Sequence, residues 1–269
     1  MSARARTIKF FNETIFEPLG FRTGAFLRYL GGTMTLLLQF FGQLFSRPFY
    51  FKLLVEQIRA IGTQSIVLVG VTAASTGMVM ALQLAYGFSR FGGELYVPKI
   101  VALSLVRELG PVFTGLMLAG RVGAGIAAEL GSMKVTEQID AIRALGTSPI
   151  RKLVIPRLLA MWIVIPLLTC MADFVGILGG LVVCMVELGF NPTFFYEKVI
   201  ESIYMRDFLE GIYKTFFFGF VIVVTGCYFG FKTEGGTRGV GLATTSSVVI
   251  SSIAILVGDF FLTKFFLSL

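Results

Sequence analysis

The chain has 269 residues, of which 55% are hydrophobic and 14% are charged. In soluble domains about a quarter of all residues are charged, so this composition excludes a soluble protein. It indicates an integral membrane protein with one membrane domain. The sequence contains no histidine, which removes the commonest general base and metal ligand. We interpret the net charge of +7 as a result of membrane topology, and not as a nucleic-acid-binding surface.

The first 60 residues are basic and contain no clear membrane span. Their one apolar run, residues 29–45, is about 17 residues long, is interrupted by Gly31-Gly32 and has basic residues on both sides. A spanning helix needs about 20 apolar residues, and a shorter run with basic flanks is typical of a helix that lies in the membrane interface. We therefore predict residues 1–60 to be a cytoplasmic and interfacial segment.

Five later stretches are long and apolar enough to cross a bilayer. They are residues 65–88, 100–130, 158–186, 215–231 and 239–263. With a cytoplasmic N-terminus, the inside segments hold 16 Lys and Arg residues and the outside segments hold 6. Because cytoplasmic loops collect Lys and Arg, this asymmetry predicts a cytoplasmic N-terminus and an outside C-terminus. The predicted fold class is an all-α membrane protein with five transmembrane helices preceded by an interfacial helix.

Small residues recur four positions apart inside the second, third and fourth spans. The pairs are 119/123, 120/124, 176/180 and 226/230. Such pairs let helix backbones approach closely, so they predict tight packing of these spans.

The second span carries an adjacent pair of charges, Arg107 and Glu108. A charge in the middle of the membrane costs roughly 2.5–3.5 kcal/mol, which makes intramembrane charges functional candidates. Neighbouring residues on a helix point about 100° apart, so each of the two needs its own partner. Gly110-Pro111 follows directly and should loosen the helix, which would free backbone carbonyls.

Five other charges lie in or beside the spans. We interpret Arg121 and Glu129 as anchors of loops at the inner end of the second span. Lys214 is expected to begin the fourth span, and Asp259 lies in the outer part of the fifth. Both could serve a polar cavity, or Lys214 could extend to the interface while Asp259 makes a hydrogen bond between helices. Asp173 lies in the middle of the third span, and the sequence does not identify its partner.

Two connecting segments show helical patterns. Residues 132–147 predict a helix that begins after Ser132 and stops at Gly146. Its apolar positions fall on one face and Lys134, Glu137, Asp140 and Arg143 on the other, so it is either a solvated connection or a helix that binds a partner. Residues 187–214 are amphipathic and aromatic, and they predict a short helix or helical hairpin on the outer surface, either as a cap or as a docking surface.

Two stretches carry a family resemblance. ELGPVFTGLMLAGRVGAGIAAELGSMKVTEQIDAIRALGTSPI, residues 108–150, and GVGLATTSSVVISS, residues 239–252, resemble the signature of MlaE-type permeases. These are membrane subunits of ABC lipid transporters that work with MCE-domain proteins. The resemblance covers residues 60–269 and implies a single permease domain over 1–269, with a transmembrane core at 61–269, a coupling helix at 132–147 and a periplasmic segment at 187–214.

The resemblance also implies function and partners. It implies a homodimer in the bacterial inner membrane that moves phospholipid and contributes to outer-membrane lipid asymmetry. Two cytoplasmic ATP-binding subunits would carry ATP and Mg, a hexameric ring of MCE proteins would sit on the periplasmic side, and a small STAS-type accessory protein would join in the cytoplasm. This chain would have no cofactor and would not be an enzyme, since its sequence has no Gly-Lys pair and hence no P-loop.

The resemblance assigns roles to two sets of residues. Those implied at a lipid-binding cavity are Arg107, Glu108, Lys214 and Asp259. Those implied at the ATPase contact of the coupling helix are Glu137, Asp140 and Arg143. Relatives often carry basic residues where this chain has Leu242 and Ser246, so a headgroup contact at those two positions is not expected here.

A different class of transporter is the alternative. A secondary transporter of a hydrophobic substrate could couple to protons through Glu108, Asp173 or Asp259. Such transporters usually show two related halves, and no internal repeat is visible in this sequence. A purely structural anchor would leave the charges of the second span unexplained.

Overall fold

The computed structural model describes residues 29, 31–40, 42–43 and 50–268. The chain divides into two compact units, residues 1–46 and 47–269. In the first unit, residues 31–40 and 42–43 are helical, so the run predicted to be interfacial is helical where it is described. That it lies in the interface stays a prediction, and the basic residues 1–28 lie outside the described residues.

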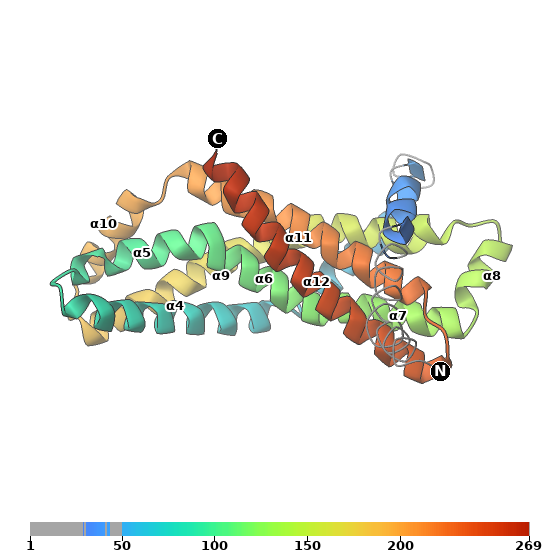
Figure 1. The fold of residues 1–269 in the computed structure, drawn as a ribbon, viewed down its shortest axis with the longest axis horizontal. Coiled ribbons are helices and arrows are strands. Elements are labelled where there is room, and N and C mark those ends of the chain that lie inside the picture. Colours follow the sequence, from blue (N-terminus) through green and yellow to red (C-terminus); the bar gives the residue numbers. More distant parts are fainter. Residues whose placement is uncertain (1–28, 30, 41, 44–49, 269) are drawn as a thin grey trace, which may run out of the picture. The chain divides into compact units, whose positions relative to one another are not determined.

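The second unit contains five helical stretches that are long and apolar enough to cross a membrane, and each contains one predicted span (Figure 1). The first combines α3 (Phe51–Gly62) with α4 (Ile66–Ser89). The second runs through η2 (Glu94–Tyr96), α5 (Val97–Ser104), η3 (Leu105–Leu109), α6 (Gly110–Leu118), η4 (Ala119–Gly123) and α7 (Ala124–Val135). The third joins η5 (Ile150–Val154) to α9 (Ile155–Glu187), and the last two are α11 (Met205–Phe231) and α12 (Gly236–Leu267). The predicted all-α membrane fold is confirmed.

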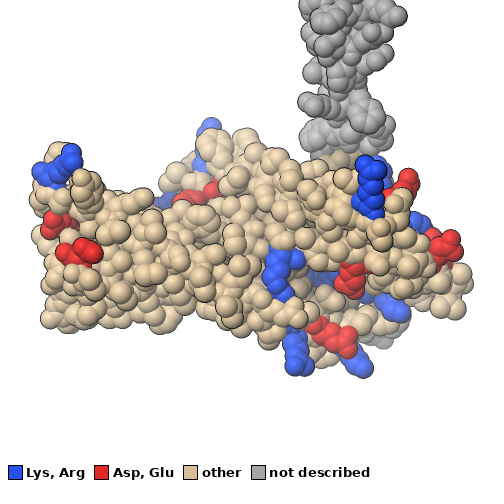
Figure 2. All heavy atoms as spheres, turned by 90° about the horizontal axis from the view of Figure 1, so that it is seen from below, with Lys and Arg blue, Asp and Glu red and all other residues tan. Residues whose placement is uncertain are grey.

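Two short helices connect the spans at opposite ends of this unit. α8 (Gln138–Ala144) lies at one end and α10 (Pro192–Ser202) at the other (Figure 1). On the face that Figure 2 shows, charged side chains gather at one end and, in a larger group, toward the other, with a few more along the upper edge between them. Large apolar side chains such as Val67, Leu167 and Phe260 are exposed on the spans, as lipid contact requires. Which end faces the cytoplasm stays a prediction.

The small-residue pairs produce close helix packing at most of the predicted positions. A Cβ added to Gly77 of α4 would lie 1.9 Å from the carbonyl oxygen of Gly176 on α9, so these two backbones touch. A Cβ at Gly230 of α11 would lie 2.6 Å from the Cβ of Leu130 on α7. Gly120 is an exception, because nothing lies within 4 Å of its Cβ position. The prediction of close packing at 120/124 is therefore wrong for Gly120 among the described residues.

The connecting helix after the second span is shorter than predicted. α7 continues through Ser132 to Val135, so Ser132 is not a helix N-cap, and α8 begins only at Gln138. The break lies at Glu137, whose φ of 59° is left-handed and cannot continue a right-handed helix. Gly146, with φ of 74°, follows the end of α8 as the sequence predicts.

The fourth span begins earlier than predicted. α10 forms the short helix expected within 187–214, but α11 already starts at Met205. The Asp207 carboxylate accepts the backbone N–H of Tyr204 at 3.1 Å, which caps the helix start. Lys214 therefore lies inside the span and not at its beginning, and its side chain is buried. The physical reason is that its charge is neutralised by other helices.

Candidate functional site

The second span has a π-helical turn at Arg107 and Glu108. Within η3, the N–H of Gly110 donates to the carbonyl of Leu105, five residues earlier. Pro111 has no N–H, so the carbonyl of Arg107 loses the donor that an α-helix would supply. Lys214 of α11 takes its place, with Nζ 3.1 Å from that carbonyl oxygen. The predicted loosening at Gly110-Pro111 is thus confirmed, and it creates an acceptor for another helix.

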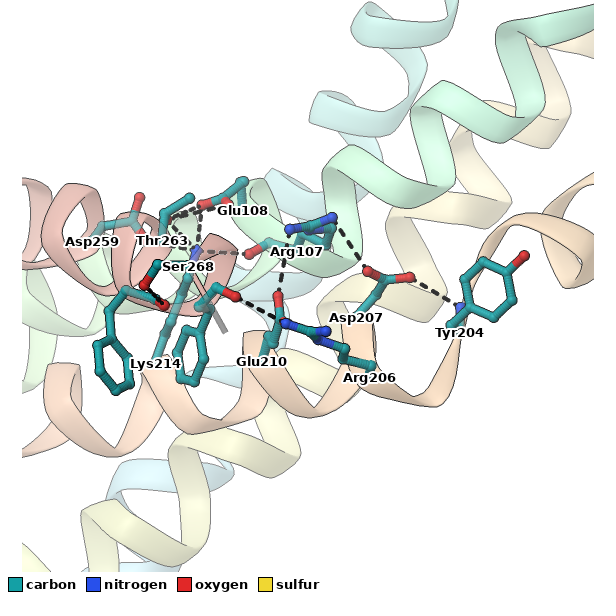
Figure 3. A network of polar contacts seen from close by, with 12 residues as sticks. Arg107, Glu108, Tyr204, Arg206, Asp207, Glu210, Lys214, Asp259, Thr263 and Ser268 are labelled. Carbon is teal, nitrogen blue, oxygen red and sulfur yellow. Dashed lines mark hydrogen bonds and ion pairs between the residues drawn. The ribbon is translucent and has the colours of Figure 1, made fainter.

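Lys214 is the centre of one half of a polar network (Figure 3). Only 2% of its side chain is exposed, and Nζ donates to Glu108 at 2.5 Å and to the Thr263 hydroxyl of α12 at 2.7 Å. With the Arg107 carbonyl, these acceptors use all three ammonium hydrogens. Asp259 lies 3.2 Å from Nζ as an ion pair, but its Oδ1 receives no hydrogen bond. Asp259 is therefore held to Lys214 mainly by charge attraction.

Arg107 is the centre of the other half. Its guanidinium lies 3.4 Å from both Asp207 and Glu210 of α11. Glu210 also accepts Arg206 Nε at 2.7 Å, and Arg206 donates to the Phe266 carbonyl near the end of α12 at 3.0 Å. Figure 3 shows the two halves side by side between the second span, α11 and α12. Each neighbouring charge of the Arg107-Glu108 pair has its own partner, as predicted.

The network has unequal charge and unequal exposure. It contains three basic side chains and four carboxylates, an excess of one acid. The side chain of Glu108 is 34% exposed and that of Asp259 is 19% exposed, whereas that of Lys214 is buried. The two carboxylates on Lys214 therefore reach the surroundings while the lysine does not. Of the groups around Lys214, Glu108 is therefore the more accessible carboxylate, while Arg206 is the most exposed side chain of the whole network.

All four predicted cavity residues are brought together by the fold. Sequence reasoning missed Arg206, Asp207, Glu210 and Thr263, which complete the network. Two signals were present in the sequence. Arg206 and Glu210 are four residues apart, the spacing of a helical ion pair, and Asp207 occupies the third residue of α11, a position that favours acidic caps.

The charges at the other end of the second span anchor neighbouring segments. Arg121, in the π turn η4, donates to the Ser65 hydroxyl at 2.5 Å and to the Gln64 amide oxygen, both in the turn between α3 and α4. Glu129 of α7 lies 2.7 Å from Arg157 of α9, whose side chain is 3% exposed. The predicted loop anchoring is confirmed for Arg121, whereas Glu129 joins two helices and anchors no loop through this contact.

The connecting helix α8 presents charged groups on an apolar base. Ile139 is 1% exposed, whereas Glu137 and Arg143 are exposed. Asp140 accepts Lys134 Nζ at 2.7 Å and an Arg143 guanidinium nitrogen at 3.1 Å. The hydrogen bond from Lys134 lowers the pKa of the Asp140 carboxyl, so it is ionised at neutral pH. Asp140 and Arg143 thus lie together, with Glu137 at the strained turn before them.

Comparisons with known proteins identify a family and several relatives. A family model described as "Permease MlaE" matches residues 54–265. A probable ABC transporter permease protein of Rickettsia felis is 41% identical over 94% of this chain and 97% of its own length. One of Synechocystis is 41% identical over 78% of this chain and 80% of its own length. The intermembrane phospholipid transport system permease protein MlaE of Haemophilus influenzae is 34% identical over 92% of this chain and 95% of its own length.

Proposed function

Because this chain belongs to the MlaE permease family, we propose that it moves phospholipids between the inner membrane and a periplasmic MCE partner. It is a multi-pass membrane permease subunit with five candidate spans. The relative from Haemophilus influenzae is named for phospholipid transport, which supports this substrate class. Outer-membrane lipid asymmetry is the process to which such transport would contribute.

The observation that carries the proposal is the polar network on an otherwise apolar surface. A phospholipid needs polar partners for its headgroup and apolar surroundings for its acyl chains. Glu108 and Asp259 have partly exposed side chains, 34% and 19%, although the Oδ1 atom of Asp259 is itself buried against Lys214. α12, which carries Asp259, also exposes Leu256, Val257 and Phe260. Headgroup and chain contacts are thus available on one helix.

The energy for transport would come from a separate chain. We propose that a cytoplasmic ATPase subunit carries ATP and Mg and docks on α8 through Glu137, Asp140 and Arg143. The exposure of Glu137 and Arg143 supports this assignment. The rest of the proposed assembly is a homodimer of this chain, a hexameric MCE ring and a small STAS-type protein. The proposed topology has a cytoplasmic N-terminus and a periplasmic C-terminus.

The substrate assignment is tested by reversing one charge. Purified complexes in proteoliposomes would be assayed for ATP-dependent transfer of a fluorescent phospholipid to the MCE protein. Glu108→Arg should abolish transfer while the ATPase still co-purifies, because it places a cation beside Lys214. Glu56→Arg is the matched control, since Glu56 is an exposed glutamate of α3. Normal transfer by the Glu108→Arg complex would remove Glu108 from the lipid site.

The partner assignment is tested at α8. Glu137→Arg with Asp140→Arg should abolish co-purification of the ATPase without loss of the folded permease. The control is Glu197→Arg with Glu201→Arg, which reverses two exposed carboxylates on α10 at the opposite end. An ATPase that still binds the α8 variant in detergent would place the contact elsewhere.

A further inference from the structure

Asp173 is a buried carboxyl group outside the network. It lies in the middle of α9 and is 5% exposed. Among the described residues, its Oδ1 has no hydrogen-bond partner and no lysine or arginine forms an ion pair with it. The carboxylates of the network, by contrast, each lie within ion-pair distance of a cation. An isolated charge is strongly disfavoured in an apolar interior, so the unpaired position requires an explanation.

The carboxyl group of Asp173 occupies a notch in the second span. Its Oδ1 is 1.8 Å from the point where a Cβ of Gly110 would lie, so only glycine admits it. The carbonyl oxygen of Leu105 is 2.9 Å from the same point. Thr114, one turn after Gly110, and Thr169, one turn before Asp173, are also buried with hydroxyls that lack partners among the described residues. The contact between α6 and α9 therefore contains a polar cluster without a cation.

A cleft borders this cluster. Gly110, Thr114 and Ala172 line it on the side of α6 and α9, and Thr72 and Thr76 line it on the side of α4. Three hydroxyl groups thus stand along a cleft that ends beside the notch. Thr72 and Thr76 donate their hydroxyl hydrogens to backbone carbonyls of α4, so Thr114 is the one of these three residues whose hydroxyl lacks a partner among the described residues.

The surrounding elements supply no neutralising charge to Asp173. α4 and α6 contain no charged residue, and Lys99 of α5 is exposed. Arg107 pairs with Asp207 and Glu210 of α11, and Glu108 pairs with Lys214 of α11. None of these charged groups forms an ion pair with Asp173 among the described residues. Cys170, one turn earlier on α9, is the remaining titratable neighbour. A carboxyl group in such surroundings is stable as the neutral acid, which retains one O–H donor.

We propose that Asp173 is a proton-binding site, occupied at neutral pH, whose O–H donates to the carbonyl oxygen of Leu105. That carbonyl accepts one hydrogen bond from Gly110, and a carbonyl oxygen has two lone pairs, so it can also accept from the acid. Loss of the proton would set a carboxylate against a carbonyl oxygen, both negative, and would separate α9 from the π turn η3. Because η3 also carries Arg107 and Glu108, proton occupancy is coupled to the geometry of the network. The site is independent of the proposed lipid substrate.

Infrared spectroscopy of the intact complex in nanodiscs tests the proposal. The wild type and Glu108→Gln should both show, at neutral pH, the C=O stretch of a protonated carboxylic acid that Asp173→Asn lacks. Asparagine keeps the shape and the donor, so this variant should retain the fold. Identical acid bands in the wild type and in Asp173→Asn would overturn the proposal.

A chemical label gives a second readout that needs no variant. A hydrophobic carbodiimide modifies protonated carboxyl groups in membranes, and mass spectrometry of the wild-type complex would locate the adduct. Asp173 should be labelled at neutral pH, less so at alkaline pH, and well above the ion-paired Asp207, which serves as the internal reference. Labelling no higher than that of Asp207 would overturn the proposal. Protection by sodium but not by choline would identify a sodium site and overturn it as well.

Discussion

Lys214 makes more polar contacts than any other side chain of the network, so its removal should destabilise the fold the most. Lys214→Met keeps the length of the side chain but leaves Glu108, the Arg107 carbonyl and the Thr263 hydroxyl without their donor, and it leaves Asp259 without its ion-pair partner. Breaking a buried ion pair from one side costs about 3–5 kcal/mol. The side chain of Glu108 is 34% exposed, so it can regain some contact with water when it loses Lys214. We therefore expect Lys214→Met to lower the free energy of unfolding by about 3 kcal/mol, the low end of this range.

The assay is unfolding of the purified chain in mixed micelles by increasing the fraction of denaturing detergent. Lys198→Met is the matched control, because Lys198 is a lysine of α10 in a surface pair with Glu201 at 2.7 Å, and it should unfold like the wild type. Adding Glu108→Gln to Lys214→Met should restore at least about 1 kcal/mol, since it removes one of the unpaired charges. The reasoning fails if the Lys214 and Lys198 variants unfold alike.

Three further changes test other parts of the structure. Gly77→Ala should lower the free energy of unfolding by about 2 kcal/mol or more in the same assay, because its Cβ would meet the Gly176 carbonyl at 1.9 Å. The control is Gly87→Ala, which has open space around its Cβ position and should be neutral or stabilising. Equal effects of the two variants would contradict the packing of α4 against α9. Glu137→Gly should make the folded protein about 1 kcal/mol more stable than Glu137→Ala does, because glycine adopts the left-handed backbone without strain. Both variants remove the carboxylate, so the comparison isolates the backbone. Equal stabilities would mean that the turn is unstrained. The pKa of Asp140 is lowered in the fold, so its contribution is complete above the ordinary value of 3.8 and is lost as the pH falls through the lower folded value. Hydrogen exchange of α8 should therefore be equally protected at pH 8 and pH 5 after correction for intrinsic rates, and loss of protection between those values would assign the order of α8 to another group.

Hydropathy located all five spans because the lipid-facing surface forces long apolar runs, whatever the helices do inside. It missed the start of α11, since residues 205–214 contain Arg206, Asp207, Glu210 and Lys214 and have the polarity of a loop. These charges are tolerated because Arg107 and Glu108 meet them from the second span. Such a contact between helices is tertiary and leaves no local pattern.

Local geometry decided which site predictions succeeded. That Arg107 and Glu108 need separate partners follows from the helix alone, and the freed carbonyl follows from Pro111. The identity of those partners, and the notch in which Asp173 lies against Gly110, depend on how helices cross. The break before α8 was hidden for another reason, because Glu137 is a good helix former and its left-handed backbone has no sequence signal.

The buried side of α12 has a simple composition with a mechanical consequence. Its buried residues are Ala243, Ser247, Ser251 and Ile255, four positions apart, and three of them are small. A smooth stripe of this kind has few large side chains that interlock with its neighbours, the exception being the Phe217 ring of α11, which packs directly against Gly258 of α12. Hydrogen bonds to neighbouring helices also hold the register of α12. Among them, the Ser247 hydroxyl donates to the Gly123 carbonyl, and the Thr263 hydroxyl accepts from Lys214. A ligand that replaced one of these hydrogen bonds would make it easier for α12 to shift along its own axis while the other spans stay in place.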